Sequence, residues 1–461
     1  MADYTWASAA EIAAAVSSSK VSAAEVTTQM LAVIEQRNPQ LNAFTAVTAE
    51  RAQARAKAVD AAPDKAKLPL AGVPFAVKNL FDIEGLPTVA GSKINRARKA
   101  ASRDAVLIER LEAAGAVLVG ALNMGEYAYD FTGENVHDGP SRNPHDPERM
   151  TGGSSGGSGG AVAGGMVPLA LGSDTNGSIR VPSSLCGIFG LKPTYGRLTR
   201  ARSFPFVASL DHLGPFARSV RDLALSYDVM QGYDAGEDAA CVDRPVERAA
   251  PFLEQGLSGL KVAVAGGYFR KGASAEALSA LDTVAKALDA RPVEIPQAQR
   301  ARAAAYVITA TEGAALHLER LRRQANDFDP AVRDRLIAGA MVPSTLVVKA
   351  QNFRRWYRDQ VLALFKDCDA IIAPATPVTA PKIGQATFTL DGIEMPVRPN
   401  MGLYTQPISF IGLPVVAVPV PLKPLPIGVQ IIAAPWREDV ALRVAYALEK
   451  MGVVAAPRPP L

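Results

Sequence analysis

The chain has 461 residues, of which 48% are hydrophobic and 20% charged, so its composition is that of a globular protein and not of a disordered one. Its formal net charge is only +4 and no basic block is visible, which argues against a nucleic-acid-binding protein. The sequence shows no apolar run long enough to cross a membrane, no secretory signal pattern and only three scattered cysteines, so we expect a cytoplasmic protein that is not membrane-bound and has neither a disulfide framework nor a zinc site.

Helices and strands alternate along the first 120 residues. Ser8 is placed to cap a first helix, and the apolar spacing over residues 23–34 predicts a second helix. The short apolar run 73–77 predicts a buried strand that ends at Lys78. Residues 105–115 predict a helix with a glycine stop, and residues 117–120 predict the next strand. This alternation is typical of an α/β sheet.

The rest of the chain continues the same pattern. Residues 132–150 predict a polar loop, and the Pro-containing connection 244–257 is interpreted as a surface loop. Residues 275–366 are mostly helical in pattern, and further strands are predicted at 260–264, 370–374, 414–420 and 425–432. Because no internal repeat and no clear linker is present, we expect a single domain over residues 1–461.

Glycine is concentrated in one place, since eight of the 37 glycines fall within residues 151–165. A flexible linker would explain such a tract, but linkers usually continue polar and residues 161–171 are apolar. The tract lacks the Gly-Lys-Ser/Thr ending of a phosphate loop and does not fit the dinucleotide fingerprint. We therefore interpret it as a catalytic backbone, because glycine allows close approach of a substrate and serine supplies hydroxyl groups.

Only four histidines are present, which bears on the type of hydrolase. The G-x-S-x-G pattern of a nucleophile elbow occurs twice in the tract, but a dense Gly/Ser tract meets it by default, and a polar loop precedes it where an elbow needs a strand. His137 and His145 lie in the polar loop and His317 on a helical pattern, so only His212 is placed to border a pocket. A serine hydrolase without a histidine base would use lysine instead.

Five segments together resemble the amidase signature family, over about residues 20–450. They are GGSSGGS at 152–158, GSDTNGSIRVP at 172–182, CGIFGLKPT at 186–194, GVPFAVKN at 72–79 and LPIGVQ at 425–430. The resemblance implies an α/β fold with a central mixed sheet flanked by helices on both faces. It also implies an amidohydrolase that cleaves a C–N bond with release of ammonia and needs no metal and no cofactor.

The resemblance implies a Ser–cis-Ser–Lys triad. Ser178 would be the nucleophile, Ser154 the bridging cis-serine and Lys78 the base, with Ser155 the competitor for the bridging role. A serine hydroxyl is a weak nucleophile until a neighbour takes its proton. Because free lysine has a pKa near 10.4, a lysine base must be held neutral by burial, and the end of an apolar strand suits that demand.

The turn before the nucleophile carries the expected oxyanion hole. Its backbone N–H donors would come from Thr175, Asn176, Gly177 and Ser178. Asn176 stands where most relatives have glycine, so its amide is also a candidate substrate contact. Asp174 and Arg180 bracket the turn and are expected to form a structural ion pair.

Further segments, at 86–95, 203–207, 211–215 and 398–409, resemble members of the family that hydrolyse small carboxylated ureides together with a small helical partner subunit. That partner is similar to the C subunit of tRNA-dependent amidotransferases, so the resemblance implies such a partner here, in a heterotetramer. A carboxylated substrate needs a cation, and arginine suits a carboxylate best. The expected substrate contacts, with residues 275–366 on the substrate side, are Ser155, Asn176, His212, Arg322 and Arg398, and the less favoured arginines are Arg320 and Arg323.

Two other classes of function stay open. A glutaminase subunit of a tRNA-dependent amidotransferase would use the same triad, and Asn176 argues mildly against it. An assembly scaffold would not need an intact triad. An amidase for another small amide, such as a different ureide or oxamate, is a variant of the favoured interpretation. Ammonia release from a panel of ureides and from glutamine would separate these functions.

Overall fold

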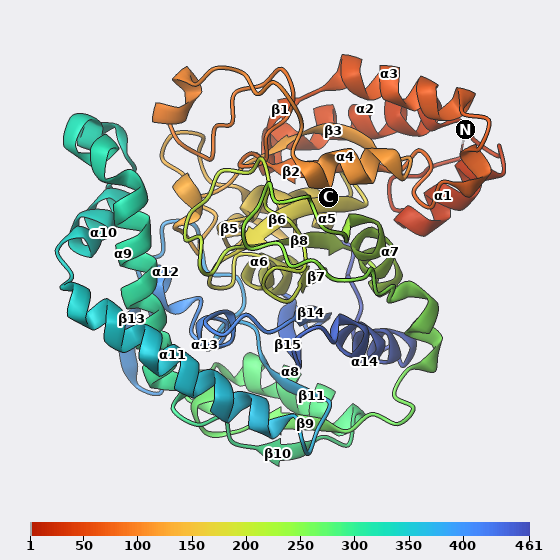
Figure 1. Cartoon of the computed structure of the whole chain (residues 1–461). Helices are drawn as coiled ribbons and strands as arrows, with labels where there is room; N and C mark the ends of the chain where they lie inside the picture. Colours follow the sequence, from red (N-terminus) through yellow and green to blue (C-terminus); the bar gives the residue numbers. More distant parts are fainter. Residues whose placement is uncertain (1) are drawn as a thin grey trace.

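An 11-stranded sheet runs through the computed structural model, which describes residues 2–461 (Figure 1). Its strands are β1 (Phe44–Val47), β2 (Pro74–Lys78), β3 (Val117–Leu122), β6 (Leu169–Asp174), β7 (Phe189–Lys192), β8 (His212–Ala217), β9 (Val262–Ala265), β10 (Arg291–Val293), β11 (Ala370–Pro374), β14 (Val415–Val420) and β15 (Ile427–Ala433). They lie in the order β1-β3-β2-β6-β8-β7-β14-β15-β11-β9-β10. The predicted strands all belong to this sheet.

The sheet is mixed. Strand β2 runs parallel to β3 and to β6, and β9 runs parallel to β10 and to β11. The other pairs are antiparallel. Every residue of β2, β6, β14 and β15 is buried, which explains why the apolar residues of β2 and β14 form continuous runs in the sequence instead of alternating with polar ones.

Helices flank the sheet on both faces. They are α1 (Ala9–Ser17), α2 (Ala23–Leu41), α3 (Ala49–Ala61), α4 (Val106–Ala113), α5 (Gly156–Ala163), α6 (Arg180–Cys186), α7 (Val220–Met230), α8 (Ala275–Ala287), α9 (Ala298–Gln324), α10 (Pro330–Ala340), α11 (Ser344–Leu364), α12 (Val397–Asn400), α13 (Gln406–Ser409) and α14 (Glu438–Lys450). Helices α6 and α14 both pack on β14 and β15 without packing on each other, so they cover opposite faces. The predicted fold class is confirmed.

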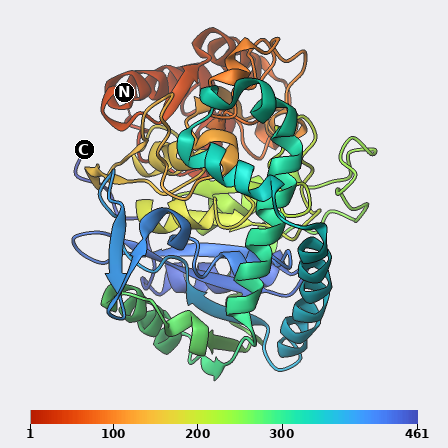
Figure 2. The same ribbon diagram turned by 90° about the vertical axis from the view of Figure 1, so that its left-hand side faces the viewer.

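Helices α9, α10 and α11 form a long arm along one side of the molecule (Figures 1 and 2). Both α10 and α11 pack against α9, and α9 in turn packs against α13. Two small hairpins lie outside the main sheet: β4 (Arg142–Asn143) with β5 (Asp146–Met150), and β12 (Thr387–Leu390) with β13 (Ile393–Pro396). Within residues 2–461, no helix has the length and apolar character needed to cross a membrane.

Three local predictions need comment. Ser8 caps α1 as expected, and Glu11 completes a capping box with it. The stretch 132–150, predicted as a loop, contains the β4–β5 hairpin, which is too short and too polar to give a strand pattern. The Gly/Ser tract is not a linker, because most of it forms the fully buried helix α5.

Candidate functional site

Lys78 is the last residue of β2, and its side chain is fully buried. Its Nζ donates hydrogen bonds to Ser154 Oγ at 2.7 Å and to Ser173 Oγ at 2.9 Å. Because β2 is parallel to β6, the carboxyl ends of the two strands meet at the same edge of the sheet, which brings Lys78 to Ser173. Burial lowers the pKa of Lys78 to about 7, against the opposing effect of three aspartates led by Asp211. At neutral pH the amine is therefore neutral in about half of the molecules and can accept a proton.

The two neighbouring serines of the Gly/Ser tract have different contacts. The Gly153–Ser154 peptide bond is cis, and the Ser154 hydroxyl accepts from Lys78. The Ser155 hydroxyl donates to the carbonyl oxygen of Ser173 at 3.2 Å and accepts from its N–H at 3.3 Å. Ser155 therefore braces β6, since its hydroxyl both donates to and accepts from the Ser173 backbone, and the substrate contact expected of it stays a prediction.

Helix α5 lies unusually close to its neighbours. A Cβ atom added at Gly157 would lie 2.5 Å from the backbone nitrogen of Asn123, a separation that real side chains do not adopt. Glycine at this position lets α5 approach the loop that follows β3, and that loop also donates from Gly125 N–H to the Ser154 carbonyl at 3.1 Å. The glycines thus hold the cis-serine in place by close packing rather than by flexibility.

The turn between β6 and α6 is held from three directions. Thr175 Oγ1 donates to Asp211 Oδ1 at 2.6 Å. The carbonyl oxygen of Asn176 accepts from Thr405 Oγ1 at 2.7 Å, and Asn176 Nδ2 donates to Thr309 Oγ1 on α9 at 2.9 Å. Helix α9, from the region expected on the substrate side, therefore contacts this turn directly.

Ser178 closes this turn and is only 3% exposed. The residue before it, Gly177, has φ +141°, and a Cβ atom there would collide with the Thr405 hydroxyl. Only glycine fits this position, because both the backbone conformation and the space exclude a side chain. The turn is thus fixed in a single conformation just ahead of Ser178.

The expected ion pair between Asp174 and Arg180 is formed, with Arg180 Nε 2.9 Å from Asp174 Oδ2 and both side chains fully buried. Burial alone would raise the pKa of Asp174, but the Arg180 guanidinium outweighs it and keeps that pKa well below its ordinary value. Arg180 also donates to Gln430 Oε1 at 2.9 Å and to the Thr405 carbonyl at 3.1 Å. The pair ties the turn to β15 and to the segment before α13.

His212, one of the expected substrate contacts, lies within the main sheet. It lies on β8 opposite Asp174 and is buried, with Nδ1 3.0 Å from the carbonyl oxygen of Asp174 and 2.6 Å from that of Leu210. Burial lowers its pKa well below the ordinary histidine value, helped by the charge of Lys192. The Nδ1 contacts of His212 join β8 to β6, while its Nε2 is buried without a hydrogen-bond partner within residues 2–461, so its role as a substrate contact stays a prediction.

Three of the arginines considered from the sequence lie together on α9. Arg322 and Arg323 are exposed on α9, where both pair with Glu319, at 2.8 and 3.8 Å. Arg320 lies 3.4 Å from His317 Nδ1 and over the ring of Phe204. These three arginines belong to the surface and edge of the helical arm, and the structure does not bring them to the serine cluster.

Arg398 lies closer to the site, but its charge is already compensated. Its Nη1 donates to the fully buried Asp130 at 2.6 Å, and its Nη2 lies 3.3 Å from Glu134. Asp130 in turn accepts from the N–H groups of Thr132 and Gly133. Arg398 thus fixes the loop beside Ser154. Its guanidinium pairs with the carboxylates of Asp130 and Glu134, where a substrate carboxylate was expected.

Arg335 is the arginine that gave no signal in the sequence. It lies on α10, donates from Nε to the Ala331 carbonyl at 2.7 Å and from Nη2 to the Tyr129 carbonyl, and its guanidinium lies 3.8 Å from the centre of the Tyr129 ring. It pairs with no carboxylate among residues 2–461, and burial lowers its pKa. In the sequence, Arg333, Asp334 and Arg335 form a short run of mixed charges that is typical of a solvated helix face. In the structure, Arg333 and Asp334 pair with each other and leave Arg335 without a carboxylate.

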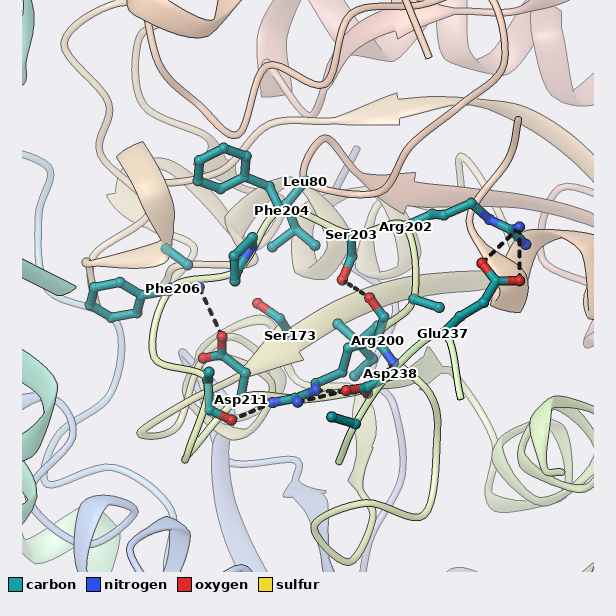
Figure 3. A pocket seen from close by; sticks show the side chains of 16 residues that line it. Leu80, Ser173, Arg200, Arg202, Ser203, Phe204, Phe206, Asp211, Glu237 and Asp238 are labelled. Carbon is teal, nitrogen blue, oxygen red and sulfur yellow. Dashed lines mark hydrogen bonds and ion pairs between the residues drawn. The ribbon is translucent and has the colours of Figure 1, made fainter. Parts of the chain in front are cut away.

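A cavity of about 260 Å³ reaches the Ser173 hydroxyl (Figure 3). Leu80, Phe204 and Phe206 line one part of it, and the Arg200–Asp238 and Arg202–Glu237 ion pairs line another. Ser173 was not among the expected site residues, although it stands in the same motif as Ser178. Its hydroxyl touches both the lysine and this cavity, so the cavity gives small molecules a place next to the buried amine.

Comparisons with known proteins extend over nearly the whole chain. A family model described as Amidase matches residues 25–442, a range that includes Lys78, Ser154 and Ser178. The chain is 54% identical over 449 residues to AtzE of Pseudomonas sp. (strain ADP), which is a component of 1-carboxybiuret hydrolase, and the match covers 96% of this chain and 98% of that protein. It is 36% identical over 474 residues to the GatA-type component of the glutamyl-tRNA(Gln) amidotransferase of Ectopseudomonas mendocina (strain ymp), covering 96% of each.

A solved structure gives the same similarity in three dimensions. It is presented as an unexpected vestigial protein complex that reveals the evolutionary origins of an s-triazine catabolic enzyme. The TM-score is 0.96 at 53% identity, covering 98% of this chain and 100% of that one. Because the match covers 98% of this chain, it extends over the main sheet, the helical arm and the residues of the candidate site.

Proposed function

We propose, from the premise that this chain belongs to the amidase family, that it hydrolyses 1-carboxybiuret to urea-1,3-dicarboxylate with release of ammonia. As a member of that family it is a hydrolase that acts on C–N bonds. The observation that carries the choice of substrate is the 54% identity to a component of 1-carboxybiuret hydrolase, against 36% to a component of an amidotransferase, at equal coverage of this chain. The whole chain acts as one amidase domain.

In the proposed first step, neutral Lys78 takes the Ser154 proton while Ser154 takes the proton of Ser178. The Ser178 oxygen then attacks the terminal carbonyl carbon of the substrate. The 2.7 Å hydrogen bond from Lys78 to Ser154 supports this relay, because proton transfer needs heavy atoms at hydrogen-bond distance. The backbone N–H groups of the turn that contains Asn176 and Gly177 stabilise the oxyanion.

In the second step the carbonyl re-forms, the C–N bond breaks, and the proton held by Lys78 returns through Ser154 to the leaving nitrogen, which departs as ammonia. Water then attacks the Ser178 ester. Lys78 again accepts a proton through Ser154, and the carboxylic acid product leaves with the Ser178 hydroxyl restored. The net reaction is amide plus water to acid plus ammonia, so no redox partner or cofactor is required.

We assign recognition of the substrate carboxylate to Arg335. Its lack of a carboxylate partner within residues 2–461, its partial burial and its contact with the loop that precedes Ser154 support this assignment. A guanidinium can bind a carboxylate through two parallel hydrogen bonds, and burial strengthens such a pair. Arg398 cannot take this role without releasing Asp130 and Glu134.

We further propose that the chain works in the cytoplasm with a small helical partner subunit, similar to an amidotransferase C subunit, in a heterotetramer. In support, a structure 53% identical to this chain is presented as a protein complex. All three cysteines are free and buried, which fits a reducing compartment.

Ammonia release tests the proposed function. The chain is expressed alone and with a candidate small helical partner subunit, and is given 1-carboxybiuret, biuret, oxamate, glutamine and acetamide, with Ser178→Ala as the blank. We expect release from 1-carboxybiuret well above that from the other substrates. Turnover of glutamine alone, and only with charged tRNA present, would instead establish a glutaminase subunit.

A further inference from the structure

The side-chain amide of Asn176 is only half satisfied. Its Nδ2 donates to Thr309 Oγ1 at 2.9 Å, but its Oδ1 is buried and accepts no hydrogen bond within residues 2–461. The residue as a whole is 6% exposed and stands two positions before Ser178. A buried oxygen without a donor costs about 1–3 kcal/mol, so an atom of this kind beside a nucleophile indicates a donor that arrives with the substrate.

The amide cannot turn away to find another donor. Thr309 is 1% exposed on the 27-residue helix α9, and it holds the nitrogen end of the amide. Thr405 holds the main chain of the same residue through its carbonyl oxygen at 2.7 Å. Because side chain and main chain are fixed from different elements, the orientation of Asn176 Oδ1 is set before substrate binds, which is the preorganisation that specificity requires.

Resting on the proposed function, we propose that the Asn176–Thr309 pair selects ureides over ordinary amides. In a ureide such as biuret or 1-carboxybiuret, the scissile carbonyl carbon carries an N–H group on its acyl side. In glutamine or an alkyl amide, the same position is a CH₂ group, which donates nothing. Asn176 Oδ1 accepts the ureide N–H, and Thr309 is the positioning residue that keeps this oxygen directed toward it.

The expected discrimination follows from the unpaired oxygen. With a ureide the oxygen gains its missing donor, whereas with a methylene analogue it stays buried and unpaired. Sites built to bind a polar group reject the analogue that lacks it more strongly than sites that merely lose an apolar contact. A penalty of about 1–3 kcal/mol corresponds to about a 5- to 150-fold difference in affinity.

Biuret and malonamide provide a matched pair of probes, because they differ only by NH against CH₂ between two identical carboxamides. Both are neutral, so Arg335 does not distinguish them. Dissociation constants are measured by calorimetry with the Ser178→Ala protein, which cannot turn either compound over. We expect biuret to bind at least about 5-fold more tightly than malonamide.

Three variants in the Ser178→Ala background locate the effect. Thr309→Val, which keeps the shape but removes the hydroxyl, should bring the two affinities within about 2-fold of each other, and Thr309→Ser should restore the preference for biuret. Thr311→Val is the matched control, since the Thr311 hydroxyl donates to the Val307 and Ile308 carbonyls of its own helix, at 2.8 and 3.1 Å, and it should leave the ratio unchanged.

Equal affinities of biuret and malonamide, absence of biuret binding, or a ratio that Thr309→Val leaves intact would each overturn the inference. An amide turned the other way, with Nδ2 toward the substrate, would also give equal affinities. Because binding is read without turnover, a chain that releases no ammonia from 1-carboxybiuret yet prefers biuret would refute the proposed substrate and support the pair as a ureide-recognition device.

Discussion

The reactivity of Ser178 should follow the titration of Lys78, with a midpoint near pH 7. Below that pH the amine is increasingly protonated and cannot accept the relayed proton, so the rate should fall about tenfold per pH unit. Above about pH 8 the amine is neutral and the rate should level off. Burial lowers the pKa of Lys78 to about 7, and this value fixes the midpoint.

The size of the effect follows from the two pKa values. A lysine with the free pKa near 10.4 would be neutral in about 1 molecule in 2500 at pH 7, whereas one with a pKa of about 7 is neutral in about half. Desolvation therefore raises the concentration of active base about a thousandfold. Ser173→Ala tests the direction in which the Lys78 pKa responds to its neighbours. The variant removes a hydroxyl that accepts from the charged amine at 2.9 Å, so the midpoint should move to lower pH, by up to about one unit.

The assay is the rate of Ser178 sulfonylation by phenylmethanesulfonyl fluoride between pH 5.5 and 9.5, which needs no substrate. Lys78→Met should react very slowly at every pH. Lys192→Met is the matched control, because burial lowers the pKa of Lys192 to about 7 as well, and a folded variant should keep the wild-type midpoint. A midpoint above pH 9, or a wild-type profile in Lys78→Met, would refute the role given to Lys78.

Three further predictions follow from the site and the tract. Ser178→Ala should lose at least about 10⁴-fold in turnover with an unchanged circular dichroism spectrum, and mass spectrometry should locate the acyl adduct of the wild type on Ser178; an adduct elsewhere would contradict the assignment. Arg335→Met should raise KM for 1-carboxybiuret about 10- to 100-fold and leave the inhibition constant of biuret unchanged, because biuret carries no carboxylate. Arg322→Met is the control and should change neither constant. An equal loss of affinity for both ligands in Arg335→Met would point to a structural role. Gly157→Ala should lower the free energy of unfolding in urea by about 1–3 kcal/mol, while Gly160→Ala, whose added Cβ would find its nearest neighbour at 3.5 Å, should be neutral or stabilising; equal effects would contradict the packing argument.

The parts of the fold that could be predicted from the sequence are those set by local pattern. Strand β2 ends at Lys78 because an apolar run ends there, and α1 begins after Ser8 because serine and Glu11 form a capping box. Strand order could not be predicted in this way. Nothing local specifies that β2 lies beside β6, which is more than 90 residues away in the chain, yet that pairing brings Lys78 to Ser173.

The motifs predict positions for a triad, but they do not predict which arginine lies on the substrate side. Arg322 and Arg335 look alike in the sequence, since each lies on a helix among other charges. What separates them is tertiary: Arg322 pairs with Glu319 at the surface, whereas Arg335 is half-buried against Tyr129 and pairs with no carboxylate in the described part of the chain. Counter-ion pairing and burial are properties of the folded chain, so spacing alone could not distinguish these arginines.

A low lysine pKa does not by itself identify a base, and this chain contains the comparison that shows why. Lys78 and Lys192 are both fully buried, and burial lowers the pKa of each to about 7. Lys192 donates only to the carbonyl oxygens of Leu413 and Pro193, which carry no proton that a neutral amine could remove. Lys78 contacts two hydroxyl groups, and that of Ser154 can pass on a proton taken from elsewhere. Burial makes either amine able to accept a proton, but only the hydroxyl neighbours of Lys78 can supply one.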